Sequence, residues 1–116
     1  MSEILIPKES EYILTAIYNE FLIRYTNGVP RDKAKIFRHQ DNVLKLVPEI
    51  WEEDLSGLLD ELKYLSLISG TKGSGVYMFV TLTTTGITYM ENRVGNKLEN
   101  VAKALIALKS LLPTNN

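Results

Sequence analysis

The sequence predicts an α+β protein that is mainly helical, with three helices, a β-hairpin and a long C-terminal helix. Three observations support this prediction. Apolar residues recur every three or four positions in residues 10–25 and again in residues 51–65, which is the spacing of one helix face. Residues 76–82 follow a glycine-rich turn and alternate between core-facing and outward-facing positions, as the residues of a hairpin strand do. A further apolar stripe starts at residue 87 and continues almost to the C-terminus.

The first helix is expected over residues 10–25, just after Pro7, which suits a first helical turn because its missing N–H would have no intrahelical partner there. The polar segment 31–40 is either a loop or a short extra helix. A brief second helix is expected to be capped by Asp41 and to end before Pro48, since proline disfavours helical geometry in the residue before it.

The third helix is expected over residues 51–65, and Trp51 begins its apolar face. We therefore expect the Trp51 side chain to be mostly buried. The hairpin that follows turns at residues 72–75. On its second strand, Tyr77 and Phe79 alternate with core residues, so they would either form an aromatic patch or pack against the C-terminal helix.

The C-terminal stripe predicts a helix that pairs with a second copy of the chain, because the stripe is too apolar to remain in water. The residues expected at this dimer contact are Leu98, Val101, Leu105, Leu108 and Leu112. The alternative is that the helix breaks at Gly95, where glycine costs about 1 kcal/mol relative to alanine, and folds back across its own domain. The expected division is a domain of residues 1–93 and a dimerisation helix with a short tail in residues 94–116.

Composition excludes several functional classes. The chain has 116 residues, 45% of them hydrophobic and 23% charged, which suits one folded domain. It has no cysteine and one histidine, His39, so we expect no metal site, no catalytic residues, no cofactor and no enzyme activity. Neither a run of about 20 apolar residues nor a secretion signal is found, which favours a cytoplasmic protein without a membrane segment.

The segment Val80–Gly86 reads Val-Thr-Leu-Thr-Thr-Thr-Gly and leads into Ile87, Tyr89, Met90 and Glu91. Together with the order helix, short helix, turn, helix and hairpin, this segment resembles the winged helix-turn-helix superfamily, in which a Leu-Thr pair and a glycine follow the wing. The C-terminal helix resembles that of PadR-like regulators and of small archaeal or phage winged-helix proteins. The resemblance implies a homodimeric transcriptional regulator that binds double-stranded DNA with its third helix and wing.

The charge of the third helix conflicts with that implication. Six acids and no base stand between residues 49 and 61: Glu49, Glu52, Glu53, Asp54, Asp60 and Glu61. Phosphates and base edges usually meet cationic or amide side chains, so these acids would repel DNA in the standard orientation. They either complement the positive end of the helix dipole or dock a protein partner, with Glu52, Glu53 and Asp60 as the contacts.

Basic residues elsewhere would compensate for these acids. The candidate DNA-binding residues are Arg31, Lys33, Lys35, Arg38, Lys45, Lys63 and Lys72. They would either hold phosphates from beside the third helix or form a solvated surface that balances the acids, within a net charge of −1. The sequence therefore favours a dimeric winged-helix DNA-binding protein. The alternative is a non-enzymatic protein-interaction module that docks a partner on its acidic third helix.

Overall fold

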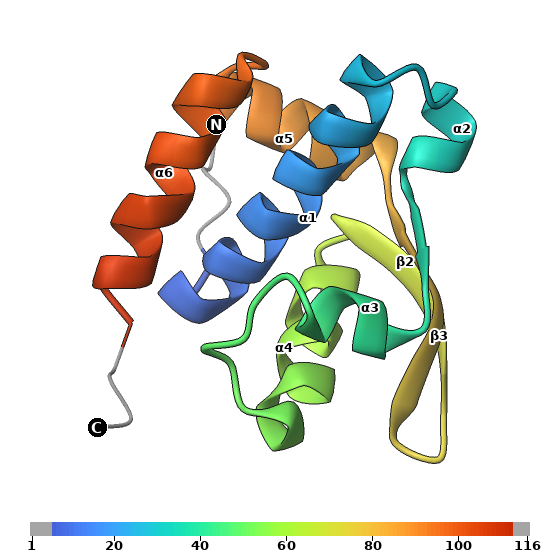
Figure 1. The fold of residues 1–116 in the computed structure, drawn as a ribbon. Helices are drawn as coiled ribbons and strands as arrows, with labels where there is room; N and C mark the ends of the chain where they lie inside the picture. Colours follow the sequence, from blue (N-terminus) through green and yellow to red (C-terminus); the bar gives the residue numbers. More distant parts are fainter. Residues whose placement is uncertain (1–5, 113–116) are drawn as a thin grey trace.

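The computed structural model describes residues 6–112 and has an α+β fold that is mainly helical. Its helices are α1 (Lys8–Thr26), α2 (Arg31–Ala34), α3 (Gln40–Leu44), α4 (Glu52–Tyr64), α5 (Thr84–Val94) and α6 (Leu98–Ser110). Its strands are β1 (Ile36–Arg38), β2 (Ile68–Gly73) and β3 (Val76–Leu82), which form one antiparallel sheet in the order β1-β3-β2. Figure 1 shows the helices gathered to one side of this sheet.

Helix α1 is the centre of the core. Every residue from Ser10 to Tyr18 is buried, because α2, α4, α5 and α6 all pack against this helix. A helix that is covered on several faces needs apolar residues all round, and α1 has them: Tyr12, Ile13, Leu14, Ala16, Ile17, Tyr18, Phe21 and Leu22 are buried. The helix predicted over residues 10–25 is thereby confirmed.

The third predicted helix is confirmed as α4, which buries Leu55, Leu59 and Leu62 on one face. The prediction that the Trp51 side chain is mostly buried is wrong, because this side chain is 54% exposed. This residue has an extended backbone and stands immediately before the first residue of α4, as its N-cap. It therefore does not follow the helical stripe, which starts with Leu55.

The segment expected to be a loop or a short helix contains both α2 and the strand β1, which the sequence did not indicate. Arg24 of α1 holds this strand in place. Its guanidinium donates to the carbonyl oxygen of Ile36 over 2.8 Å and lies 4.3 Å from the centre of the Phe37 ring. Strand β1 pairs with β3, with Ile36 opposite Thr81.

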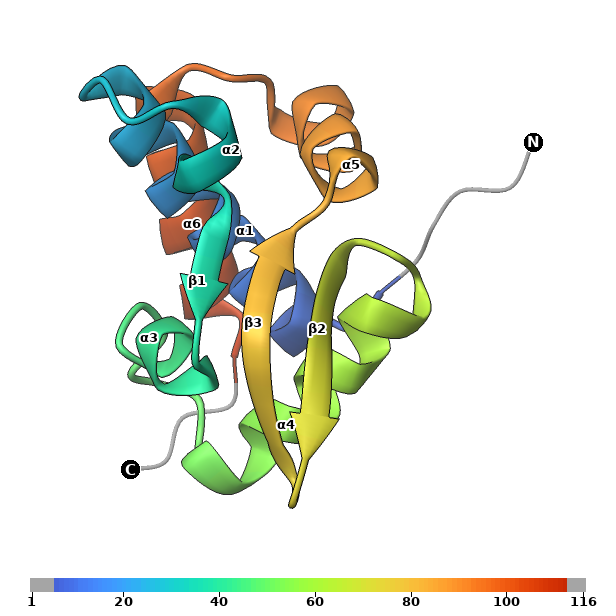
Figure 2. The same ribbon diagram turned by 90° about the vertical axis from the view of Figure 1, so that its right-hand side faces the viewer.

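Strand β3 does not alternate evenly between buried and exposed residues. Tyr77, Val80 and Leu82 are buried, whereas Phe79 is 66% exposed. The pairing of β3 with β2 shifts at this point, between the pairs of Ser69 with Thr81 and Thr71 with Met78, and Phe79 has a left-handed backbone with φ of 57°. This irregularity, a β-bulge, turns Phe79 away from the core and into solvent. Figure 2 shows that one face of the sheet is not covered by a helix.

Helix α5 starts with a capping bond, because the Thr83 hydroxyl accepts from the Gly86 N–H over 2.9 Å. Glycine is required at position 86, since a Cβ there would lie 2.2 Å from the Leu67 carbonyl oxygen. The Thr-to-Gly segment after the hairpin therefore has a packing reason: it allows α5 to approach the start of β2 closely.

The prediction of one long C-terminal helix is wrong. Helix α5 ends at Val94, just before Gly95, and α6 is a separate helix of 13 residues that lies beside α1 (Figure 1). Gly95 has φ of 80° and ψ of −166°, and its carbonyl oxygen accepts from the Tyr18 hydroxyl over 2.8 Å. Both the backbone and this bond fix the turn between the two helices.

The residues expected at a dimer contact pack inside the chain instead. Val101, Leu108 and Leu112 are buried in the common core, and Leu98 and Leu105 are half-buried against it. The physical reason is that α1 has an apolar surface that α6 covers, so these five side chains are shielded from water wholly or in part within one chain, whereas Ile106 and Leu111 stay exposed. The segment assigned to dimerisation, residues 94–116, thus includes a helix that completes the core of the same chain.

Candidate nucleic-acid interface

The open face of the sheet is bordered by cations from several elements. Arg31 and Lys33 project from α2, which Figure 2 shows next to the upper end of β1, and both are exposed. Arg38 is exposed at the end of β1, and Lys72 lies on β2. Arg31, Lys33 and Arg38, which are close in sequence, are therefore exposed on consecutive elements, whereas the Lys72 side chain reaches Asp60 of α4.

The other candidate cations are less available or lie elsewhere. The Lys35 Nζ is 3.8 Å from the Asp32 carboxylate. Lys63, in the last turn of α4, has its Nζ 5.7 Å from the centre of the Tyr77 ring. Lys45 is exposed at the C-terminal end of α3 and is not part of the sheet or of α2.

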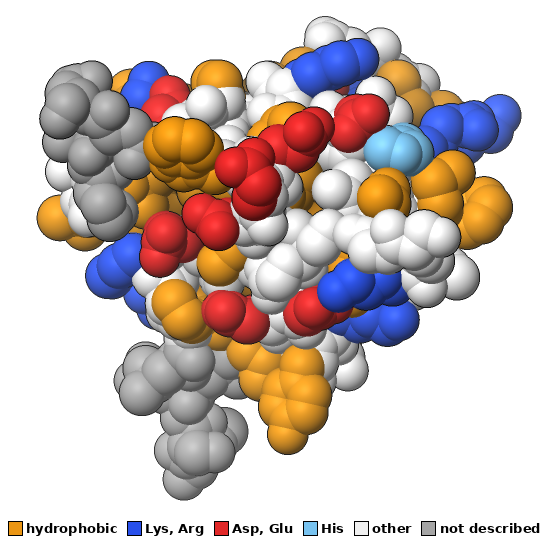
Figure 3. Space-filling model, turned by 90° about the horizontal axis from the view of Figure 1, so that it is seen from below, with side chains coloured by type: hydrophobic (Ala, Val, Ile, Leu, Met, Phe, Trp, Pro, Cys, Tyr) orange, Lys and Arg blue, Asp and Glu red, His pale blue; other side chains and the backbone are white. Residues whose placement is uncertain are grey.

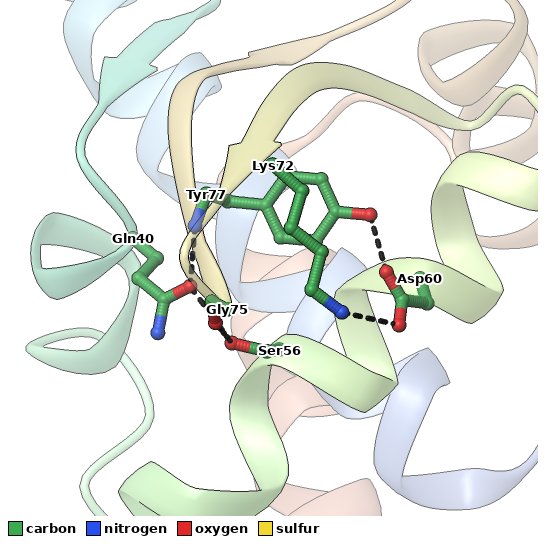
Figure 4. Close-up of polar contacts among 6 residues, drawn as sticks. All are labelled: Gln40, Ser56, Asp60, Lys72, Gly75 and Tyr77. Atoms are coloured by element: carbon green, nitrogen blue, oxygen red, sulfur yellow. Dashed lines mark hydrogen bonds and ion pairs between the residues drawn. The ribbon is translucent and has the colours of Figure 1, made fainter.

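A first set of bonds fastens the hairpin to α4 (Figure 4). Lys72 of β2 pairs with Asp60 of α4 over 2.9 Å, and the Tyr77 hydroxyl of β3 donates to the same carboxylate. The Tyr77 and Lys72 hydrogen bonds lower the pKa of Asp60. Burial, reinforced by the bond to Asp60, raises the pKa of Tyr77 to about 12, so this side chain stays a hydroxyl donor. Asp60, expected as a protein contact, is thus engaged within the chain.

A second set of bonds fastens the hairpin tip to α3 and α4. The buried Gln40 side chain of α3 accepts from the Tyr77 N–H over 2.8 Å, and the Ser56 hydroxyl lies 3.0 Å from the same amide oxygen. Ser56 also donates to the Gly75 carbonyl over 2.6 Å, as Figure 4 shows. We call the contacts of Gln40, Ser56, Asp60 and Lys72 with the hairpin the hairpin clamp.

Only part of the acidic segment remains free. Glu49 accepts from the Tyr12 hydroxyl and pairs with Lys109 over 2.9 Å, and Glu61 accepts from Ser10 over 2.7 Å. The acids that project into solvent are those of the first turn of α4: Glu52, Glu53 and Asp54. In Figure 3, red acidic side chains cross the middle of the lower face, and blue basic ones lie on both sides of them, most of them on the right.

Beside these acids lies a shallow groove, lined by Asp41, Leu44, Lys45, Pro48, Ile50 and Glu52. Trp51 is the residue between two of the lining positions, and more than half of its side chain faces solvent. An exposed tryptophan next to an apolar groove is typical of protein contacts. The N-terminal start of α4 therefore has the features of a docking surface more than those of a DNA-reading surface.

Sequence reasoning missed Gln40, and it assigned Trp51 to the core. No local signal marks Gln40, because its partners Ser56 and Tyr77 are 16 and 37 positions away. For Trp51 a signal exists: it stands just before three acids, Glu52 to Asp54, which favour the first turn of a helix. That pattern places Trp51 at the cap.

The described part of the chain contains neither a metal site nor a membrane-spanning helix. Within residues 6–112, no group of three or more histidine, aspartate or glutamate side chains is arranged to hold a metal ion. None of the helices in the same range combines the length and apolar character needed to span a bilayer.

Comparisons with known proteins give no relative from which a role could be transferred. No family model, no curated protein and no solved structure matches this chain. The function must therefore be argued from the charges and exposed side chains of the surface itself.

Proposed function

We propose that this protein is a winged-helix DNA-binding protein that contacts the DNA backbone with the open face of its sheet and with α2, not with the start of α4. The winged-helix assignment is supported by the element order helix, short helix, strand, helix, helix and hairpin and by the strand order β1-β3-β2. The wing would be the hairpin of β2 and β3. As a regulator it would be non-enzymatic and free of cofactors.

The observation that carries the proposal is the separation of charge. Arg31, Lys33 and Arg38 form no ion pair with any residue of the described range and border the open sheet face. Three exposed acids, Glu52 to Asp54, lie elsewhere, in the first turn of α4, and Asp32, the exposed acid on α2, is paired with Lys35. A DNA backbone would be attracted to the first surface and repelled by the second.

The size of the basic surface predicts weak, salt-sensitive binding. Three neutralised phosphates would lower the affinity roughly 40-fold between about 50 and 200 mM salt. The matched variants are Lys33→Gln with Arg38→Gln, and Lys97→Gln with Lys103→Gln on the side of α6, since each pair removes two exposed charges. Fluorescence anisotropy of a labelled duplex of about 20 base pairs measures both affinity and salt dependence.

We expect the first pair of substitutions to reduce the salt effect to roughly 4-fold, and the second pair to leave it near the wild-type value. Equal losses in the two double variants would mean that only net charge matters, and would overturn the assignment of the surface. If the wild-type protein does not bind the duplex even at low salt, binding of double-stranded DNA is refuted.

A second candidate function is docking of a protein partner at the start of α4. The specific observation in its favour is the exposed Trp51 beside Glu52, Glu53, Asp54 and the groove lined in part by Leu44 and Pro48. Charge complementarity favours a segment with basic and apolar residues. A peptide composed of lysine and leucine is a suitable probe.

The fluorescence of Trp51, the sole tryptophan, reports on this surface directly. Docking predicts a saturable blue shift with the lysine-leucine peptide, and a large loss of affinity in the double variant Glu52→Gln, Glu53→Gln. A shift that is unchanged by these substitutions, or that does not saturate, would exclude this candidate.

A further inference from the structure

Two non-glycine residues with left-handed backbones lie next to each other on neighbouring strands. They are Arg38 of β1, with φ of 64°, and Phe79 of β3, with φ of 57°. Arg38 is paired with Val80, the residue that follows Phe79. A left-handed backbone is unfavourable for bulky side chains and is found where the surrounding structure compensates for it, often at functional sites.

The result of this irregularity is an exposed aromatic ring. Even alternation from the buried Tyr77 would place Phe79 in the core, but the bulge puts Val80 there and leaves Phe79 66% exposed. Ile36 and Met78 nearby are also partly exposed. The sheet therefore presents a ring to solvent at a backbone conformation that a simple strand would avoid.

The charges around the ring indicate what it contacts. The guanidinium of Arg38 is exposed, and Arg31 and Lys33 lie on α2, which borders the same face. A flat ring beside a free guanidinium fits a nucleotide, whose base stacks on the ring while its phosphate binds the cation. The faces of bases in a duplex are hidden by stacking, so this ring requires an unpaired base.

We propose that the open sheet face binds single-stranded nucleic acid, with Phe79 stacked on an unpaired base and Arg38 bound to the adjacent phosphate. This inference rests on the proposed DNA-binding function of the same face and names the form of nucleic acid that it accepts. It assigns the stacking to Phe79, where the charge argument alone assigns only backbone contacts.

The experiment measures anisotropy of labelled oligothymidylate of about 15 nucleotides at about 50 mM salt, with a labelled duplex in parallel. Phe79→Leu keeps apolar area but removes the aromatic face, whereas Phe79→Tyr keeps the face. Tyr64→Ala is the matched control, because Tyr64 is an 87% exposed aromatic residue on α4, away from the sheet. Circular dichroism of each variant establishes that it is folded.

We expect Phe79→Leu to weaken oligothymidylate binding by about 5- to 150-fold, which is the usual effect of losing one stacked base. Phe79→Tyr and Tyr64→Ala should bind as the wild type does, and duplex binding should change little in all three variants. Arg38→Gln should weaken the binding of both oligothymidylate and the duplex.

Several results would overturn the inference. Wild-type affinity in Phe79→Leu would show that the ring does not stack, and duplex binding without oligothymidylate binding would refute the single-strand preference while leaving the proposed function standing. Binding of neither ligand would refute both proposals together. Equally strong, Phe79-dependent binding of poly-L-glutamate would identify the partner as an acidic protein segment instead.

Discussion

At the scale of single residues, Gln40 has an unusual position, because one amide oxygen serves two other elements. It accepts from the backbone of β3 at Tyr77 and lies within bonding distance of Ser56 of α4. The side chain is buried, so the Tyr77 N–H has no water as a ready substitute, whereas Ser56 keeps the Gly75 carbonyl as an acceptor. A buried donor without a partner costs more free energy than a typical hydrogen bond contributes.

Replacing Gln40 by leucine should therefore lower the free energy of unfolding by about 1–3 kcal/mol, because the Tyr77 N–H is left without its acceptor. Ser56→Ala is the matched control. It removes one hydroxyl but leaves the bond from Tyr77 to Gln40, so its loss should be smaller. Urea unfolding measures the free energy of unfolding of both variants. A larger loss of this free energy in Ser56→Ala than in Gln40→Leu would contradict this account of the clamp.

At the scale of elements, the turn between α5 and α6 decides the shape of the C-terminal third. Gly95 has a combination of φ and ψ that is nearly restricted to glycine, and nothing within 4 Å crowds its Cβ position. The constraint at this residue is therefore backbone conformation and not space. Gly57, in the middle of α4, also has open space but an ordinary helical position.

These two glycines predict opposite effects of the same substitution. Gly95→Ala should destabilise the protein by about 1–3 kcal/mol, because alanine strains the turn. Gly57→Ala should stabilise it by about 0.5–1 kcal/mol, because alanine is the better helix former. Thermal unfolding of the two variants checks the signs. A Gly95→Ala variant as stable as the wild type would mean that the turn has rearranged.

The elements themselves were largely predictable, because periodic burial leaves a local trace. The stripes around Ile13 and Leu59 identified α1 and α4, and the glycines near residue 75 identified the hairpin. Strand β1 was not predictable, since three residues with one buried side chain, Phe37, show no period. A β-bulge leaves no trace in the alternation of apolar and polar residues, so the sequence could not predict that Phe79 is exposed.

The C-terminal error has a different origin. A stripe such as Val101, Leu105 and Leu108 shows that a helix is covered but not by which molecule, since α1 and a second chain would require the same residues. For the candidate site, the cations of α2 and β1 were indicated by composition. The pairing of Lys72 with Asp60 was not, because it depends on the register of the hairpin against α4.

At the scale of the whole molecule, acid stability depends on two carboxylates that join separate parts of the fold. The hydrogen bonds from Tyr77 and Lys72 lower the pKa of Asp60. For Glu49, burial acts to raise the pKa, but the bonds from Tyr12 and Lys109 outweigh it, and the net direction is downward. Glu49 links α1 and α6, whereas Asp60 links α4 and the hairpin.

A carboxylate whose pKa is lowered by folding stabilises the protein above its ordinary pKa of about 4, and this contribution disappears as the pH falls through the folded value. We therefore expect the midpoint temperature of thermal unfolding to decrease as the pH drops below about 4. The double variant Asp60→Asn, Glu49→Gln should show a shallower fall. Asp32→Asn is the control, because Asp32 is 93% exposed. An equally steep fall in the double variant would assign acid sensitivity to other groups.

The hairpin clamp has a consequence for how any ligand binds the sheet. Ser56 holds the hairpin tip at Gly75 and Asp60 holds the neighbouring pair Lys72 and Tyr77, so this end of the hairpin shares the rigidity of α4. Flexible loops lose conformational freedom when they close on a ligand, and part of the attraction is spent on ordering them. Here that ordering is completed during folding. A strand of nucleic acid would thus meet a preformed platform, and the entropy lost on association would come mainly from the nucleic acid.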